Sequence, residues 1–444
     1  MTTDAAIQQW WSLFHDPVLD SLIARAAAAN LELRIAETRI REARAQRQLT
    51  VAAALPSLDV GGSAMNSRRS ENIASDSNSQ TLYQANFDAG WELDIFGGIR
   101  RQVEAADANL AATVEDRRDV LVTLEAEVAR NYLELRASQL RLAIALDNIR
   151  TQEQTVELVR NKFQIGLGGE LEIVQAETQL SLIKSQVPAL ESTSTQAMHQ
   201  LALLLGQQPQ SLKAALSKVT PVPPVPPQLP ATLPSDLLRQ RPDIRSAERQ
   251  LAAATATVGV ATAELFPRFS LSALIGLQST SLGDLVSTGS RFWAAGPAVQ
   301  WPLFDGGRAR AGIEITEARR DRARITYEKT VLSALAEAEN ALVALDREQT
   351  TRTMLSAAVV TSQRAVVIAR GQYKAGLTTF LNVLQSENAL YQSQDKLALS
   401  DQRLAVDLVA LYKSLGGGWQ TETDPTSPPP AIDPQNTPAA RNTL

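Results

Sequence analysis

The stretch Tyr83-Gln-Ala-Asn-Phe-Asp-Ala-Gly-Trp-Glu-Leu-Asp-Ile95 alternates between apolar and polar side chains along its whole length. Its odd-numbered positions hold Tyr, Ala, Phe, Trp, Leu and Ile, whereas its even-numbered positions hold Gln, Asn, Asp, Gly and Glu. Alternation with a period of two predicts a β-strand with one apolar face and one polar face. The run is long enough for a membrane strand, which needs ~9–11 residues with apolar side chains toward lipid and polar ones toward a lumen.

Three other segments carry the same pattern less completely. The predicted strands cover about residues 55–69, 81–96, 267–279 and 291–304. They fit either a half-buried sheet in a soluble α+β protein or part of a barrel that several chains build together. The smallest barrels need about eight strands, so two chains would give a filled barrel, and three would give twelve strands around an open channel.

Long helices separate these strands. Apolar residues recur every seven positions through the first of them, at Val114, Leu121, Val128, Leu135, Leu142, Ile149, Val156 and Phe163. A sustained seven-residue repeat is typical of supercoiled helices. We predict long helices over about residues 100–165, 170–206, 308–370 and 378–415, with a kink or break at Pro188. A long soluble coiled coil would show the same heptads, so the helices alone leave that alternative open.

The chain repeats itself after about 210 residues. Trp91 to Gly98 has a counterpart at 301–307, and Phe163-x-x-Gly166 returns as Tyr373-x-x-Gly376. Such self-similarity at one offset predicts a duplicated structural unit. We place the first repeat at residues 1–220, a Pro-rich linker at 221–234, the second repeat at 235–420 and a disordered tail at 421–444.

Composition excludes several classes of function. The 444 residues carry a net charge of −5, which gives no basic surface for nucleic acid. The absence of cysteine rules out disulfides and thiolate sites, and neither of the two histidines lies in a metal-binding or catalytic pattern. No phosphate loop or nucleophile motif is present, so we predict no enzyme and no cofactor. No apolar run is long enough for a transmembrane helix. The start has no apolar cleavable leader, so we expect a mature or trimmed form.

Four short motifs together resemble those of TolC-like outer membrane factors. They are Trp91-Glu-Leu-Asp-Ile-Phe-Gly-Gly98, Arg241-Pro-Asp-Ile244, Glu264-Leu-Phe-Pro267 and Tyr412-Lys-Ser-Leu-Gly-Gly-Gly-Trp419. The similarity runs from about residue 10 to 420. It is greatest to the lipoprotein branch, of the NodT and OprM kind, that serves tripartite multidrug efflux systems of Gram-negative bacteria.

The resemblance implies a homotrimer whose 12-stranded β-barrel, with four strands from each chain, lies in outer membrane lipid. Below the barrel, a long α-helical coiled-coil barrel would extend into the periplasm. The implied function is the passive exit duct of a tripartite pump, with a periplasmic adaptor and an inner-membrane RND pump as partners. A lipid anchor is expected only of a full-length precursor. A type I protein secretion duct and a soluble periplasmic coiled-coil adaptor or scaffold are the alternatives.

The periplasmic gate of such a duct would lie one or two turns beyond the Gly turns at the helix tips. Many relatives carry a ring of acidic residues there, but the second repeat has neutral side chains at the matching positions, Asn382 and Gln385. The first repeat has Glu172 and Gln175. We expect Glu172 to form the only charged ring, with Tyr373, Thr378, Asn382 and Gln385 holding the mouth closed by hydrogen bonds; a solvated surface carboxylate is the alternative. Adaptor contact is expected at the tip turns, Gly166, Gly168, Gly169 and Gly376.

Overall fold

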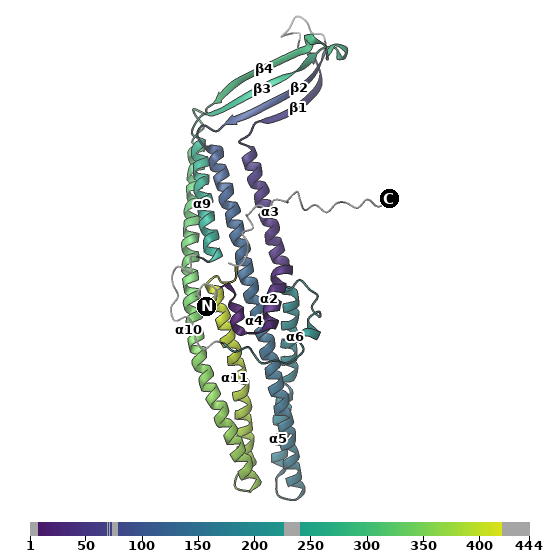
Figure 1. The fold of residues 1–444 in the computed structure, drawn as a ribbon, viewed down its shortest axis with the longest axis vertical. Coiled ribbons are helices and arrows are strands. Elements are labelled where there is room, and N and C mark those ends of the chain that lie inside the picture. The colour runs from purple at the N-terminus through teal and green to yellow at the C-terminus, as the bar shows by residue number, and fades with distance from the viewer. Residues whose placement is uncertain (1–7, 69, 71, 73–78, 226–239, 420–444) are drawn as a thin grey trace, which may run out of the picture. The chain divides into compact units, whose positions relative to one another are not determined.

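A computed structural model describes residues 8–68, 70, 72, 79–225 and 240–419 (Figure 1). The chain divides into two compact units. The helical unit comprises Met1–Glu37, Glu115–Ile244 and Val331–Leu444, and the sheet unit comprises Thr38–Val114 and Arg245–Thr330. Most of the predicted linker and the whole predicted tail, residues 226–234 and 421–444, lie outside the described residues.

The sheet unit holds four antiparallel strands in the order β1-β2-β3-β4. Their bounds are Ser57–Ser67 for β1, Gln80–Leu93 for β2, Arg268–Ser279 for β3 and Arg291–Gln300 for β4. Short 3-10 turns, η2 (Leu282–Asp284) and η3 (Thr288–Ser290), connect β3 to β4. The described part of the chain contains no helix that is both long enough and apolar enough to cross a bilayer.

The strand register gathers the apolar side chains on one face of the sheet. Val60 pairs with Phe87, Phe87 pairs with Ile275, and Ile275 pairs with Trp293. Polar residues lie on the opposite face of β1, β2 and β3, where Asp59 pairs with Asp88 and Gln84 with Gln278. The predicted alternation is therefore present in β2, and its apolar row continues across all four strands, whereas the other face of β4 carries Phe292 and Ala294. The apolar face is also uncovered, because Phe87 is 54% and Trp293 78% exposed.

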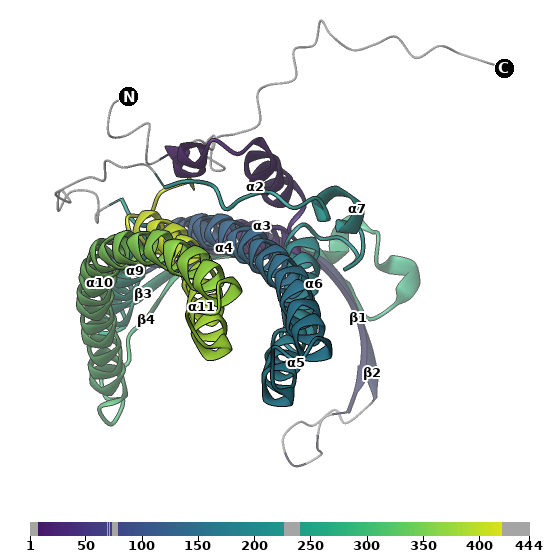
Figure 2. The same cartoon turned by 90° about the horizontal axis from the view of Figure 1, so that it is seen from below.

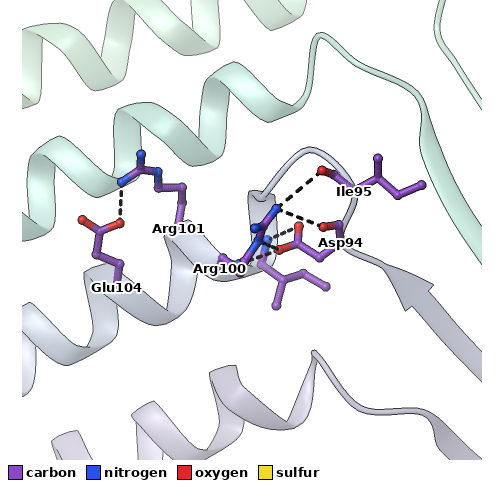
Figure 3. Close-up of polar contacts among 6 residues, drawn as sticks. Asp94, Ile95, Arg100, Arg101 and Glu104 are labelled. Atoms are coloured by element: carbon purple, nitrogen blue, oxygen red, sulfur yellow. Dashed lines mark hydrogen bonds and ion pairs between the residues drawn. The ribbon is translucent and has the colours of Figure 1, made fainter.

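β2 and β4 end several residues earlier than their sequence patterns predict. β2 stops at Leu93 because the next residue, Asp94, turns its carboxylate to the start of the following helix (Figure 3). Asp94 accepts hydrogen bonds from the backbone N–H groups of Ile99 at 3.0 Å and Arg100 at 2.9 Å, and from the Arg100 guanidinium at 3.1 Å. β4 stops at Gln300, and Pro302 beyond it has no N–H to donate to a strand neighbour.

The same contact fixes the base of the sheet in both repeats. The Trp91 indole donates to the carbonyl of Ala54 at 3.0 Å, and the Trp301 indole donates to that of Leu265 at 3.1 Å. Each carbonyl belongs to the turn that leads from a helix into a strand, after α3 (Leu31–Ala52) and α9 (Pro242–Ala263) respectively. Each tryptophan therefore ties the end of one strand to the start of its neighbour.

Two helices of 67 residues run through both units, α4 (Gly98–Gln164) and α10 (Arg308–Lys374). Each is about 100 Å long at ~1.5 Å per residue. In the helical unit they lie beside the return helices α5 (Glu170–Lys184), α6 (Val187–Leu204) and α11 (Phe380–Ser414) (Figure 2). Ion pairs join neighbours: Arg352 to Asp401 between α10 and α11, and Arg141 to Asp395 between α4 and α11.

The first return helix is broken, whereas the second is continuous. The single helix predicted over 170–206 is two helices, α5 and α6, which are separated at Ser185 and Gln186. Pro188 lies in the first turn of α6, where its missing N–H costs nothing. The break therefore falls beside the proline, where the sequence predicts a kink or break. The corresponding position in α11 is Ala398, which allows the helix to continue.

The core of the helical unit lies where the N-terminal segment meets the long helices. The segment consists of η1 (Trp10–Phe14) and α2 (Pro17–Ala29), and Trp10 stacks on Tyr412 with ring centroids 6.1 Å apart. Tyr132 on α4 is fully buried, and its hydroxyl donates to Asp16 at 2.6 Å. Burial and this hydrogen bond raise the pKa of Tyr132 to about 12, so it remains a donor at any physiological pH. The short helix α7 (Lys213–Leu216), Val222 and Val225 pack against the same core.

Candidate functional site at the helix tips

The two helix pairs end in turns of the same geometry. Gly166 and Gly376 both have φ of +74°, a left-handed conformation that suits glycine. After each glycine, a backbone N–H reaches back across the turn: Leu167 to the Lys162 carbonyl and Leu377 to that of Gln372, both at 2.8 Å. This is the hydrogen bond that closes a Schellman C-cap. It leaves Leu167 71% and Leu377 78% exposed at the tips.

Gly168 and Gly169 complete the first tip turn, and they differ in the space around them. A Cβ at Gly168 would lie 3.2 Å from the Glu172 carboxylate, whereas a Cβ at Gly169 would meet nothing within 4 Å. Gly168 thus leaves room for the Glu172 side chain, and Gly169 provides the N-cap of α5.

A small apolar cluster holds the four helix ends together just above the turns. Tyr373 and Phe380 are its aromatic members, with ring centroids 5.6 Å apart, and both are 5% or less exposed. Its other buried members are Val156, Val159, Ala176, Ala369 and Val383. Because α4, α5, α10 and α11 all contribute, the cluster positions the polar side chains around it.

Tyr373 and Glu172, two of the predicted gate residues, lie together. The Tyr373 hydroxyl donates to the Glu172 carboxylate at 2.8 Å, which joins α10 to α5. Burial and this hydrogen bond raise the pKa of Tyr373 well above its ordinary value. The phenol therefore stays protonated and can serve only as the donor in this pair.

The remaining predicted gate residues do not join that pair. Asn382 donates to Thr378 at 2.7 Å within the first turn of α11. Gln175 is half-buried on α5 and Gln385 is exposed on α11, and within the described part of the chain neither side chain makes a hydrogen bond. Within the described residues, the predicted gate residues thus form two separate polar pairs, Tyr373 with Glu172 and Asn382 with Thr378.

Sequence reasoning missed an ion pair beside the apolar cluster. Arg370 on α10 donates to Glu387 on α11 at 2.7 Å, and the Glu387 side chain is only 5% exposed. The Thr155 hydroxyl on α4 lies 3.3 and 3.4 Å from the two carboxylate oxygens, so its one O–H can donate to the carboxylate. A hollow of about 260 Å³ lies next to this group, between α4, α10 and α11. The repeat of Gln175-Ala-Glu177 as Gln385-Ser-Glu387 was the available signal, although it does not indicate burial.

Lys162, in the last turn of α4, was also missed. Its ammonium donates to the backbone carbonyl of Tyr373 at 3.0 Å and lies 3.7 Å from the centroid of the Tyr373 ring. Nothing in the heptad pattern indicates this contact, because it joins residues from different repeats. Lys162, Tyr373 and Glu172 thus connect α4, α10 and α5 in a chain of contacts.

Comparison with known proteins identifies the class of molecule that carries these tips. A sequence model described as outer membrane efflux protein matches residues 22–207 and 233–417. The chain belongs to the outer membrane efflux protein family. It is 34% identical to the pyoverdine export outer membrane protein OpmQ of Pseudomonas aeruginosa over 94% of this chain and 88% of OpmQ. It is 32% identical to the cation efflux system protein CusC of Escherichia coli over 93% of this chain and 88% of CusC.

A solved structure agrees with this family assignment. The outer-membrane channel OprN superimposes with a TM-score of 0.90 at 37% identity, over 93% of each chain. The resemblance to TolC-like outer membrane factors is therefore confirmed, and so are the outer-membrane location and the role as an efflux exit duct. The fold is that of the outer-membrane channels, mostly helical with one four-stranded sheet.

Proposed function

We propose that this efflux protein is a homotrimer in which three four-stranded sheets close into one 12-stranded β-barrel in outer membrane lipid. The barrel would continue into a helical duct in the periplasm, as the outlet of a tripartite pump. The duct would conduct passively, because selection and energy supply would belong to its partners, an inner-membrane RND pump and a periplasmic adaptor. The described residues contain no cluster of side chains that could hold a metal ion.

The uncovered apolar face of the sheet carries this proposal. The row of Val60, Phe87, Ile275 and Trp293 crosses all four strands and lies exposed in one chain. In water such a face would have to be covered, whereas in a bilayer it meets hydrocarbon. The opposite face, with Asp59, Gln84 and Asp88, suits a water-filled lumen.

The edges of the sheet support closure with other copies. β1 and β4 are the outer strands, so each has one unpaired edge in a single chain. Backbone groups cannot stay unpaired in lipid, which makes a closed barrel the only arrangement open to a membrane sheet. Three chains supply twelve strands, enough for an open channel, whereas two would form a barrel that side chains fill.

The tips would be where the adaptor meets the duct and where the duct closes. Leu167 and Leu377 are exposed beside the Gly turns and offer apolar contacts for a helical partner. Glu172 would form a ring of three carboxylates around the mouth, and its bond from Tyr373 would hold α5 against α10 in the closed state. The relatives are named for pyoverdine and for cations, so we infer that the duct itself discriminates little between substrates.

Neighbouring arginine substitutions on the two faces of β2 test the barrel. Phe87→Arg places a charge on the lipid face, which costs ~2–4 kcal/mol per strand near the bilayer centre. Asp88→Arg is the matched control, because it places the same side chain on the polar face opposite Asp59. We expect the wild type and Asp88→Arg to leave outer membranes in mild detergent as trimers that conduct in planar bilayers. Phe87→Arg should give little assembled trimer.

Two results would overturn the barrel. One is a wild type that is soluble as a monomer or dimer without detergent. The other is equal assembly of Phe87→Arg and Asp88→Arg, which would mean that neither face meets lipid.

A further inference from the structure

Lys162 contacts Tyr373 in two ways. It donates to the Tyr373 carbonyl at 3.0 Å, and its charge lies 3.7 Å from the ring centroid. The same carbonyl also accepts the N–H of Gly376 within the tip turn. One ammonium group therefore restrains both the backbone and the ring of the residue that donates to Glu172.

The other repeat lacks this arrangement. Gln372 stands at the position of Lys162, and Phe163 at the position of Tyr373. Phe163 is 46% exposed and has no hydroxyl, whereas Tyr373 is 5% exposed. The lysine contact is thus not a general feature of these turns. It occurs where a phenol joins two helices.

The Lys162 ammonium over the Tyr373 ring favours one fixed orientation of the Tyr373 hydroxyl. A cation over an aromatic face is attracted to the ring quadrupole, by ~0.5–1 kcal/mol at exposed sites and ~2 when desolvated. It also withdraws electron density from the ring, which makes the phenol O–H a stronger hydrogen-bond donor. Packing against Phe380 limits the ring from another side. The Tyr373 hydroxyl therefore points to Glu172 with little freedom to leave it.

We propose that Lys162 is a positioning residue for the closed tip and acts through the Tyr373 hydroxyl. Losing the ammonium frees the tyrosine ring, weakens its bond to Glu172 and lets α5 part from α10 more often. The inference rests on the proposed function, because it requires a duct that opens at its tips.

Single-channel recordings in planar bilayers test this with four variants of the purified full chain. Lys162→Met removes the charge but keeps most of the side-chain length, and Lys162→Arg keeps the charge. Tyr373→Phe keeps the ring and removes the donor, and the fourth variant combines Lys162→Met with Tyr373→Phe. Lys184→Met is the control, because Lys184 pairs with Glu153 at 2.8 Å and joins α5 to α4 without contact to the tyrosine.

We expect Lys162→Met to raise time-averaged conductance about fivefold, while Lys162→Arg and Lys184→Met stay near wild type. Tyr373→Phe should raise conductance at least as much, and adding Lys162→Met to it should change nothing further. A Lys162→Met channel that conducts like wild type would overturn the inference, as would an equal increase in the Tyr373→Phe background. A wild type that forms no channel would instead refute the proposed function.

Discussion

The two helix tips contain the same ion pair in two different environments. Arg160 pairs with Glu177 in the first repeat, and Arg370 pairs with Glu387 in the second. The first pair is exposed, with 57% and 43% of its side chains accessible, whereas Glu387 in the second is 5% accessible. Thr155 adds a hydrogen bond only to the second pair, in which Arg370 is 37% accessible. The contact has thus been kept in both repeats, but its surroundings have changed.

The bases of the two strand pairs show the opposite behaviour. Trp91 and Trp301 donate to equivalent carbonyls at nearly equal distances, and both are partly exposed. Both indoles have the same structural role, because each hydrogen-bonds a helix-to-strand turn and holds it against the strand that returns beside it. The duplicated contacts thus stay alike where both repeats build the sheet, and they diverge where the tips have different neighbours.

The largest expected effect is a difference in stability between variants of the two ion pairs. Arg370→Met should lower the free energy of unfolding by about 2 kcal/mol, because it leaves the Glu387 carboxylate buried without its cation. Arg160→Met should cost less than ~1 kcal/mol, because water can solvate Glu177. Thermal unfolding of the two variants in the same detergent measures the difference. Equal losses would show that burial does not distinguish the pairs.

A smaller effect is expected at the base of the sheet, and there the repeats should agree. Trp91→Phe and Trp301→Phe each remove one solvent-exposed hydrogen bond, at a cost of about 1 kcal/mol or less. The melting temperatures of the two variants should therefore fall by similar amounts. If one variant melts well below the other, the two junctions are not equivalent and the contrast with the tips loses its basis.

The features that sequence predicts best are those that the local backbone determines. Alternation in residues 83–95 gave both faces of β2, because the side-chain period of a strand is two. The break beside Pro188 followed from a missing N–H. The alternating pattern predicted a longer strand than β2, and a single residue explains the difference. Asp94 caps α4 where the strand was predicted to continue.

The contacts that sequence could not supply join distant helices. Lys162 and Tyr373 come from different repeats, and only the packing of α4 against α10 brings them together. The spacing of Arg370 and Glu387 is visible in the sequence, but their burial depends on Thr155 of a third helix. Gln175 and Gln385 were chosen by their repeat positions, and within the described part of one chain they make no hydrogen bond.

The smallest expected effect is on ion selectivity, which reports the charge at the mouth separately from how tightly the mouth closes. Glu172→Gln removes the carboxylate but leaves an amide oxygen that can accept the Tyr373 hydroxyl. It should lower the cation-to-anion permeability ratio by about twofold, because salt screens charges that face water, and it should raise open probability less than Tyr373→Phe does, because the amide still accepts the hydroxyl, although more weakly than a carboxylate. Asn382→Glu adds a carboxylate at the position of the second repeat that matches Glu172, so it should raise the ratio by a similar factor. Reversal potentials measured across a salt gradient report both changes. A permeability ratio that is unchanged in both variants would mean that Glu172 is an ordinary solvated carboxylate and that the tips differ in closure alone.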